Sequence, residues 1–379
     1  MAAEYRNPKT KAGNKMTKAQ STDIRVALFG QSGAGKTTFL VSYFGNQQRH
    51  SFEQKHGYRL EADDVAVGNQ LLSRYYKMEC GQFPDGTSVS SEYKFNLKLA
   101  GLSEPGLHIT WVDYPGAWWE SQPKDSAEKT SRQNALSGLL GCHVGLLLVD
   151  GMQYRRHGLS YVRALLDQFK SEIRRLKDAA SKVTQRENFP QIWLLAISKA
   201  DVLSPGTTAE MIGKEITMGA ADQIKGVADA LDSKQFGHQY LLLSSAEADG
   251  SKVLDATKCI GFQLLAPIAL ESMLLDAVAE ARKKENGRSG LFAKVLDTLS
   301  SIVDMVDSLD DFLPPKYQVF TKLLKAMSIK EELNKGASHF REKQAAASKR
   351  GDIIAATASA MKAELSSPMA RKAYFNNQA

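Results

Sequence analysis

Short apolar runs, each ending in glycine or polar residues, recur along the first two thirds of the chain. Five of these runs have the length of strands, which predicts buried strands. They cover residues 24–29, 93–99, 107–112, 191–197 and 240–244. Because helical patterns separate most of them, we expect an α/β fold with a mostly parallel central sheet flanked by helices.

Apolar residues recur at steps of three and four in other segments, which predicts helices. One helix is expected over about residues 62–78, another over 159–177 and a third over 264–281. The first of them carries a stripe formed by Val65, Asn69, Leu72 and Tyr76.

A glycine-containing break at residues 286–290 ends the α/β pattern, and only helices are expected beyond it. The helix that begins at Leu291 has an apolar face, but its other face carries five aspartates that anionic lipid would repel, so membrane contact is disfavoured. The predicted organisation is a basic disordered tail over 1–21, an α/β domain over 22–283 and a helical region over 284–379.

The first predicted strand leads directly into a glycine-rich turn that opens a helix. The turn matches G-x-x-x-x-G-K-[ST], in which backbone N–H groups and the helix N-terminus surround phosphate oxygens. Lys36 would reach the β and γ phosphates, and Thr37 would bind Mg²⁺. A turn that only joins strand to helix is the alternative. The predicted phosphate-binding residues are Gly30, Ser32, Gly33, Ala34, Gly35, Lys36, Thr37 and Thr38.

Three further motifs follow predicted strands in order. Asp113-Tyr114-Pro115-Gly116 could hold Mg²⁺ through Asp113 and meet a γ-phosphate with the N–H of Gly116. Ser198-Lys199-Ala200-Asp201 offers a carboxylate that accepts from the N1–H and exocyclic amine of guanine, and the Lys199 stem can cover the base. The backbone of Ser245-Ala246 could contact the guanine O6.

This series of motifs resembles the P-loop GTPases of the Ras-like and translation-factor (TRAFAC) class over about residues 22–283. The resemblance implies a Ras-like P-loop NTPase fold and GTP or GDP with Mg²⁺ as ligands. Two positions depart from the family: Ser198 stands where it has Asn or Thr, and Glu247 where it prefers Lys. The shorter Ser198 should tie the base loop to the phosphate loop more weakly. Asp113 to Gly116 followed by Trp118 is also similar to YcjX-like bacterial P-loop proteins.

The family also has a switch threonine that closes on Mg²⁺ and the γ-phosphate. We place it at Thr87, because a predicted strand follows as the family layout requires; Ser88, Ser90 or a plain Pro-Asp-Gly turn are the alternatives. The segment before Thr87 is longer than in small GTPases of the Ras kind, so an insertion in switch I is expected at about 45–82. The implied catalytic residues are Lys36, Thr87 and Gly116, and the implied metal ligands are Thr37, Thr87 and Asp113.

Hydrolysis is less fully supported than binding. Small GTPases of the Ras kind carry a Gln directly after Asp-x-x-Gly to orient the attacking water, and this chain has Ala117. Another group such as Glu120, or a partner, must then place the water, or turnover is slow. Candidate charge stabilisers within the insertion are Arg49, Arg59 and Arg74.

Composition is that of a cytoplasmic protein with basic ends. Hydrophobic residues make up 43% of 379, enough for a large core. The three cysteines lie far apart, without disulfide or metal spacing, and no apolar run reaches the length of a membrane span. Residues 1–20 and 316–379 are strongly basic, yet no aromatic-interleaved basic patch or helix-turn-helix pattern indicates nucleic acid.

We therefore expect a GTP-binding switch with slow or partner-assisted hydrolysis, which passes its nucleotide state to a protein partner through the switch regions or the C-terminal helices. An ATP-using P-loop enzyme, either a kinase or a motor-type ATPase, and a nucleotide-binding scaffold without hydrolysis are the alternatives. The guanine-reading Asp201 favours the first, because an ATP-using enzyme has no need of it.

Overall fold

The computed structural model describes residues 23–86, 90–140, 142–180, 190, 192–233, 235–269, 357 and 360–377. Its main sheet has the strands β1 Asp23–Phe29, β2 Tyr58–Ala62, β3 Ser91–Leu99, β4 Leu107–Asp113, β5 Val144–Asp150, β6 Ile192–Ser198, β7 Gln239–Leu242 and β10 Tyr374–Asn376. A small separate pair comprises β8 Glu247–Ala248 and β9 Val253–Asp255. The helices are α1 Lys36–Gln47, α2 His50–His56, α3 Val65–Glu79, α4 Ala117–Glu120, α5 Ser126–Leu140, α6 Gly151–His157, α7 Leu159–Ala180, α8 Ala209–Gly219, α9 Ala221–Leu231 and α16 Pro368–Ala373, with 3-10 turns η1 Ala200–Val202 and η2 Phe262–Leu264.

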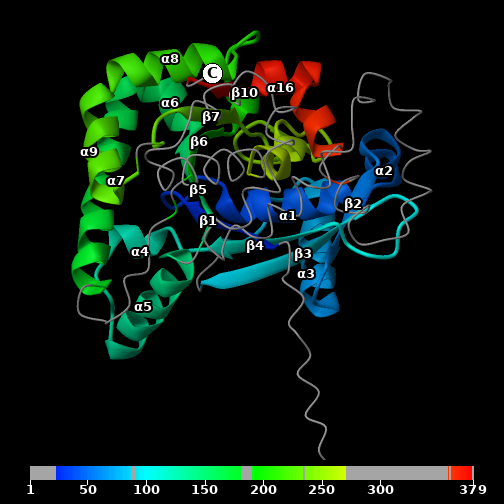
Figure 1. Ribbon diagram of the computed structural model, residues 1–379, viewed down its shortest axis with the longest axis horizontal. Helices are drawn as coiled ribbons and strands as arrows, with labels where there is room; N and C mark the ends of the chain where they lie inside the picture. Colours follow the sequence, from blue (N-terminus) through cyan, green and yellow to red (C-terminus); the bar gives the residue numbers. More distant parts are fainter. Residues whose placement is uncertain are drawn as a thin grey trace, which may run out of the picture.

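The eight strands of the main sheet are ordered β10-β7-β6-β5-β1-β4-β3-β2 (Figure 1). Neighbouring strands from β7 to β4 run parallel, whereas β2, β3 and β10 are antiparallel to their neighbours. All five predicted strands are confirmed, as β1, β3, β4, β6 and β7. This mixed, mostly parallel sheet with flanking helices confirms the predicted α/β fold class.

Helices cover both faces of the sheet, and aromatic residues fill the interfaces. On one face, Phe39 of α1 lies with its ring centroid 5.0 Å from that of Trp111 in β4. On the other, Phe169 of α7 lies 5.6 Å from Phe29 of β1. Trp111 is opposite Val26 in the register, and positions 26 and 29 point to opposite faces of a strand, so these contacts lie on different sides. Figure 1 shows α9 alongside α7.

The segment expected to be an insertion folds as α2, β2 and α3. β2 pairs with β3 and forms one edge of the sheet. α3 packs on α1 so closely that a Cβ on Gly45 would lie 2.2 Å from Cγ of Tyr75. The segment therefore contributes a strand as well as the predicted helix.

The stripe expected on this helix faces outward. Val65, Leu72 and Tyr76 are 74%, 37% and 65% exposed. The sequence offers a second stripe one position away, and the space left by Gly45 on α1 admits Tyr75 from that stripe. The buried residues of α3 are Gly68, Leu71, Tyr75 and Met78.

The end of the chain returns to the sheet (Figure 1). Residues Tyr374–Asn376 pair with β7 and form its outer neighbour, β10. Upstream, Oε1 of Glu364 lies 2.6 Å from Nδ1 of His56 in α2. A Cβ on Gly106 would lie 1.9 Å from Oγ1 of Thr357, so these two residues are also in close contact. The strand β10 lies in the range 284–379, where only helices were expected. The sequence did not predict it because a strand of three residues is too short to show a periodic pattern.

Several expectations fall on residues outside the description. They include the basic tail over 1–21, the helix that begins at Leu291 and the helix over 264–281 beyond residue 269. The boundary between 283 and 284 stays a prediction. Within the described part of the chain, no helix combines the length and the apolar composition that crossing a membrane requires.

Gly45→Ala tests the packing of α3 on α1. The added Cβ would lie 2.2 Å from Tyr75, so one helix must shift, and such overpacking costs about 1–3 kcal/mol. We expect a lower midpoint of urea unfolding. The matched control is Gly226→Ala in α9, whose Cβ would meet only the flexible Lys170 side chain at 3.1 Å. Its midpoint should stay the same or rise, because Ala favours helix; equal stability of the two variants would contradict the close contact.

Candidate functional site

The predicted phosphate loop joins β1 to α1. Gly33 and Gly35 have φ of 76° and 93°, a region that residues with a side chain seldom adopt. The N–H of Ala34 donates to the carbonyl of Gln31 over 3.2 Å and closes the turn. Gly35 is the N-cap of α1, which has 12 residues. The loop therefore lies at a helix N-terminus, where backbone N–H groups and the helix dipole both attract an anion.

Lys36 lies over this loop and is only 7% exposed. Its Nζ donates to the carbonyl oxygens of Gly30 and Gln31 over 2.6 and 3.0 Å. A buried ammonium needs strong acceptors. Phosphate oxygens carry full negative charge where carbonyl oxygens carry only partial charge. The position of Lys36 therefore suits a phosphate in the loop.

The segment after β4 lies against the phosphate loop because β4 pairs in parallel with β1. Asp113 is opposite Leu28 in the register and fully buried. Gly116 comes closer still: a Cβ on it would lie 2.6 Å from the backbone nitrogen of Ser32 and 2.7 Å from Nζ of Lys36. Only glycine fits at this position, so the backbone of Gly116 borders the space that a bound phosphate would share with Ser32 and Lys36.

Two of the predicted metal ligands, Thr37 and Asp113, lie in the described part of the chain, and their chemistry fits magnesium. Thr37 is half-buried in the first turn of α1, and Asp113 ends β4. One hydroxyl and one carboxylate, completed by phosphate oxygens, form an oxygen set that Mg²⁺ takes. Burial raises the pKa of Tyr93, and the charge of Asp113 raises it further. Thr87 lies outside the described residues, and its alternative Ser90 donates its hydroxyl to the carbonyl of Asp113 over 2.9 Å.

Arg132 of α5 holds the segment that follows Gly116, and the sequence did not indicate this role. It is 5% exposed, and its Nη1 donates to the carbonyls of Trp118 and Ser121 over 2.9 and 2.6 Å. Its guanidinium lies 5.5 Å from the ring centre of Trp118 and pairs with Glu128 at 2.8 Å. These contacts attach α4 firmly to α5.

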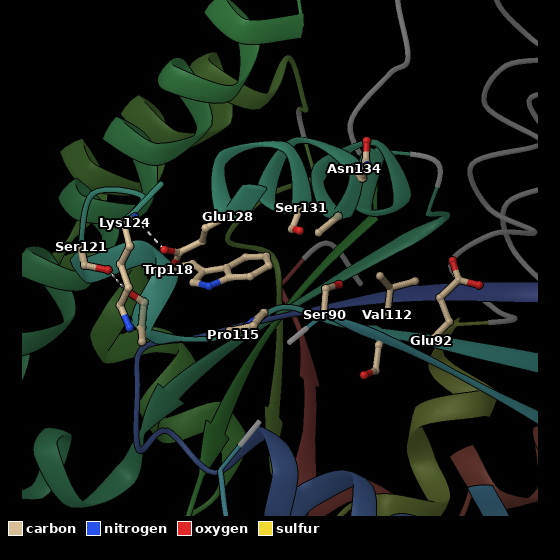
Figure 2. Close-up of a pocket in the computed structure, with 13 residues that line it drawn as sticks. Ser90, Glu92, Val112, Pro115, Trp118, Ser121, Lys124, Glu128, Ser131 and Asn134 are labelled. Atoms are coloured by element: carbon tan, nitrogen blue, oxygen red, sulfur yellow. Dashed lines mark hydrogen bonds between the residues drawn. The ribbon is translucent and has the colours of Figure 1, made fainter. Parts of the chain in front are cut away.

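A cavity of about 770 Å³ opens beside this segment (Figure 2). Its lining comes from β3, β4, α4, α5 and the residues next to them. Figure 2 shows Pro115 and Trp118 on one wall and Ser131 and Asn134 of α5 on another. Ala117 also lines the cavity. The position that carries Gln in Ras-like GTPases therefore has a methyl group beside open space.

The predicted base-recognition loop follows β6. Lys199 has a φ of 53°, in the left-handed region. Asp201 accepts from Oγ of Ser244 over 2.7 Å and from the N–H of Ala248 over 3.3 Å. Because a carboxylate has about four lone-pair sites, these contacts orient Asp201 and still leave it acceptor capacity. Ser244 was not among the predicted residues, although it directly precedes the predicted Ser245.

The segment after β7, which carries the predicted base-binding backbone, is tied to the phosphate-loop helix, whereas Ser198 contacts β5. Oγ of Ser198 donates to the carbonyl of Val149 in β5 over 3.3 Å. The tie comes from α1, where Oγ of Ser42 donates to the carbonyl of Ser245 over 2.5 Å. Ala246 is buried next to it. The helix that carries Lys36 and the predicted base-binding backbone are thus joined directly.

The candidate charge stabilisers differ in their positions. Arg49 pairs with Glu79 at 3.2 Å, and Arg59 pairs with two glutamates of its own segment at 2.8 and 2.9 Å. Arg74 lies near Tyr93 and lowers its pKa, against the effect of Asp113.

Comparison with known proteins finds likeness in fold alone. No family model and no curated protein sequence match this chain. Similar solved structures include translation elongation factor SelB from Methanococcus maripaludis with a GTP analogue, the signal recognition particle receptor SRb from Chaetomium thermophilum with GTP and SRX, and the cytosolic domain of the FeoB iron transporter from T. maritima in a GDP form. Their identities are 13%, 16% and 13%, and their TM-scores 0.26, 0.34 and 0.29. The matches cover 59%, 59% and 93% of this chain and 30%, 90% and 99% of those chains.

Because these identities and scores are low, we base the site on this chain's own residues. β1, the loop from Gly30 to Thr37 and α1 form a P-loop. Asp113 is the last residue of β4, and Asp201 lies just beyond the carboxyl end of β6 in the same sheet. The chain is therefore a P-loop protein with a mostly parallel α/β sheet, and its motifs stand in the order on which the resemblance to Ras-like GTPases rests.

Gly116→Ala tests the contact between the two loops. The added Cβ would collide with the nitrogen of Ser32 or displace Lys36, so the segment can no longer rest on the phosphate loop. We expect tryptophan fluorescence to lose its difference between protein loaded with a GTP analogue and with GDP, because the buried Trp118 follows Gly116 by two residues. GDP binding should persist. Gly226→Ala should keep the difference, and its retention in Gly116→Ala would argue against the contact.

Proposed function

We propose that this protein is a GTP-binding switch. It binds GTP or GDP with Mg²⁺ in the loop from Gly30 to Thr37, and it hydrolyses GTP slowly or with the help of a partner. The observation that carries the proposal is the approach of Gly116 to Ser32 and Lys36, because it couples the phosphate loop to a second segment.

That contact makes the segment sensitive to the γ-phosphate. With GTP in the loop, the N–H of Gly116 can donate to a γ-phosphate oxygen beside Lys36. GDP lacks this oxygen, so the same segment loses the interaction. Since Arg132 attaches the following residues to α5, the difference extends beyond the loop. In GTPases, switch segments that become ordered through contacts with the γ-phosphate, and are released on hydrolysis, are a known basis of switching.

Guanine recognition is assigned to Asp201. Its carboxylate, held by Ser244 and the N–H of Ala248, accepts two hydrogen bonds from the N1–H and the 2-amino group of guanine. Adenine cannot donate in this pattern. The Lys199 stem would cover the ring, and the backbone at Ser245 and Ala246 would meet O6.

The residues around the phosphates have distinct roles. Lys36 would bind the β and γ phosphates, and Thr37 and Asp113, with Thr87 as the predicted switch residue, would hold Mg²⁺. The ion would supply positive charge that offsets the charge of the phosphates. Ala117 cannot orient water, so the chain alone places the nucleophile poorly.

A protein partner is proposed to bind at the wall of the cavity beside Ala117. The cavity, about 770 Å³ in volume, is bordered by the segment that responds to Gly116. It has room for a partner side chain that orients the water. The helical region that the sequence predicts over 284–379 is a second proposed route to a partner.

Asp201→Asn tests the guanine site. The amide presents an N–H where the carboxylate accepts, so guanine is repelled and xanthine, with a carbonyl at position 2, is favoured. Two charge-assisted hydrogen bonds contribute about 1.5–3 kcal/mol each, so affinity for fluorescent GDP should fall by at least roughly 100-fold. Xanthosine diphosphate should bind more tightly.

The titration uses fluorescent GTP, GDP, xanthosine diphosphate and ATP with the wild type and Asp201→Asn. Lys36→Ala is the control that should lose triphosphate binding whatever the base. A wild type that prefers ATP would favour an ATP-using enzyme. Unchanged GDP affinity in Asp201→Asn would place the base elsewhere.

Phosphate release tests the consequence of Ala117. Unassisted Ras-like GTPases turn over at on the order of 10⁻⁴ s⁻¹, and we expect the purified protein to be this slow or slower. Lys36→Ala sets the background of the single-turnover assay. Release at roughly 1 s⁻¹ by the protein alone, a normal rate for an enzyme, would show that another residue orients the water.

A further inference from the structure

Asp150 ends β5 beside the base-recognition loop, and both of its carboxylate oxygens are engaged. It is opposite Ser198 in the pairing of β5 with β6. Its Oδ2 accepts from Nζ of Lys199 over 2.6 Å, with side chains that are 10% and 34% exposed. Its Oδ1 caps α6 by accepting from the N–H groups of Met152 and Gln153 over 2.8 and 3.3 Å. A single carboxylate therefore joins the start of α6 to the base loop.

Lys199 needs such an anchor because of its backbone conformation. A left-handed φ costs roughly 1–2 kcal/mol in a residue with a side chain and persists where the surroundings impose it. On one side the N–H of Ala200 donates to the carbonyl of Leu243 over 2.9 Å. On the other side Asp150 holds the Lys199 ammonium. The turn at Lys199 leads the chain into Asp201, so its conformation sets where that carboxylate points.

Gly151 adds a second constraint at the same place. A Cβ on it would lie 2.3 Å from the carbonyl oxygen of Ser198 and 3.1 Å from that of Lys199. The first residue of α6 therefore rests directly on the backbone of the base loop. Asp150 is itself fixed from α7, where the hydroxyl of Tyr161 accepts its N–H over 3.1 Å. Burial raises the pKa of Tyr161 to about 12, so this hydroxyl stays neutral.

We propose that Asp150 is a positioning residue for base selection. By holding Lys199, it keeps the lysine stem over the purine ring and directs Asp201 to the edge that carries the 2-amino and N1–H groups. This inference rests on the proposed GTP-binding function. Because the ion pair is partly open to solvent, its contribution to folding is small, and its effect falls on nucleotide release and on selectivity.

The experiment compares Asp150→Asn, Lys199→Met and the double variant in the full chain. Asn keeps one acceptor oxygen for the cap of α6, but it removes the charge and puts an amide donor where Oδ2 accepts from Lys199. Met keeps the apolar stem of the lysine. Release of a fluorescent GDP analogue is measured, together with competition between GDP and inosine diphosphate. Inosine lacks the 2-amino group and so one of the two bonds to Asp201. Thermal unfolding without nucleotide monitors the fold.

Asp150→Asn should speed release by roughly tenfold and reduce the preference for GDP over inosine diphosphate, at an unchanged Tm. The double variant should behave like Lys199→Met, because both changes remove the same pair. The matched control is Lys177→Met, which breaks the pair of Lys177 with Asp232. That pair is also 2.6 Å long and its lysine is also 34% exposed, but it joins α7 to the end of α9. It should leave release and preference unchanged.

Three results would overturn the inference. Release and preference like those of the wild type in Asp150→Asn would remove the role of Asp150 and leave GTP binding intact. A lower Tm with equal loss of GDP and inosine diphosphate affinity would make Asp150 only structural. A wild type that fails to bind the GDP analogue would refute the proposed function itself.

Discussion

The parallel pairing of β1 with its neighbours β4 and β5, continued by β5 with β6, is the constraint on which the site depends. Parallel strands bring their carboxyl ends to one edge of the sheet, and the loops after β1, β4 and β6 meet there. The register pairs Leu28 with Asp113 and Asp150 with Ser198. Backbone hydrogen bonds between the strands therefore fix how close the loop after β4 comes to the phosphate loop, and how close the start of α6 comes to the base-recognition loop. A slip by one residue would turn Asp113 to the opposite face and take Gly116 away from the phosphate loop.

Much of this edge could be predicted from the sequence because its signals are local. Each signal lies within a few residues of the chain: the glycines of the phosphate loop directly after β1, Asp113 at the end of β4 and Asp201 three residues beyond β6. The residues that hold these groups in place are distant from them in the sequence. Ser244 reaches Asp201 across 43 positions, and Ser42 reaches Ser245 across 203. Neither Ser42 on α1 nor Ser244 after β7 carries a local sign of a contact that only the folded chain creates, so both were missed.

The sheet edges and the helix faces were harder to predict for a related reason. β2 and β10 have five and three residues, too few to show a period of two. Periodicity predicted α3 to within a few residues but did not orient it. Val65 and Leu72 are as apolar as the residues that are buried, and the choice between the stripes is made by Gly45 on α1. A helix's existence depends on its own sequence, whereas its orientation depends on the shape of its neighbour.

The segment after Gly116 explains how a contact of one backbone group can have a larger effect. Gly116 itself has no side chain to hold it, but Trp118 two residues later is buried beside Arg132. Separating the buried Arg132 from its carbonyl and carboxylate partners would leave its charge uncompensated, which is costly. α4 and α5 must therefore move together when Gly116 moves. Ala117 lies within this unit and on the wall of the cavity, so under the proposed function a partner bound to that wall would both sense the nucleotide and reach the position where the chain lacks a group to orient water.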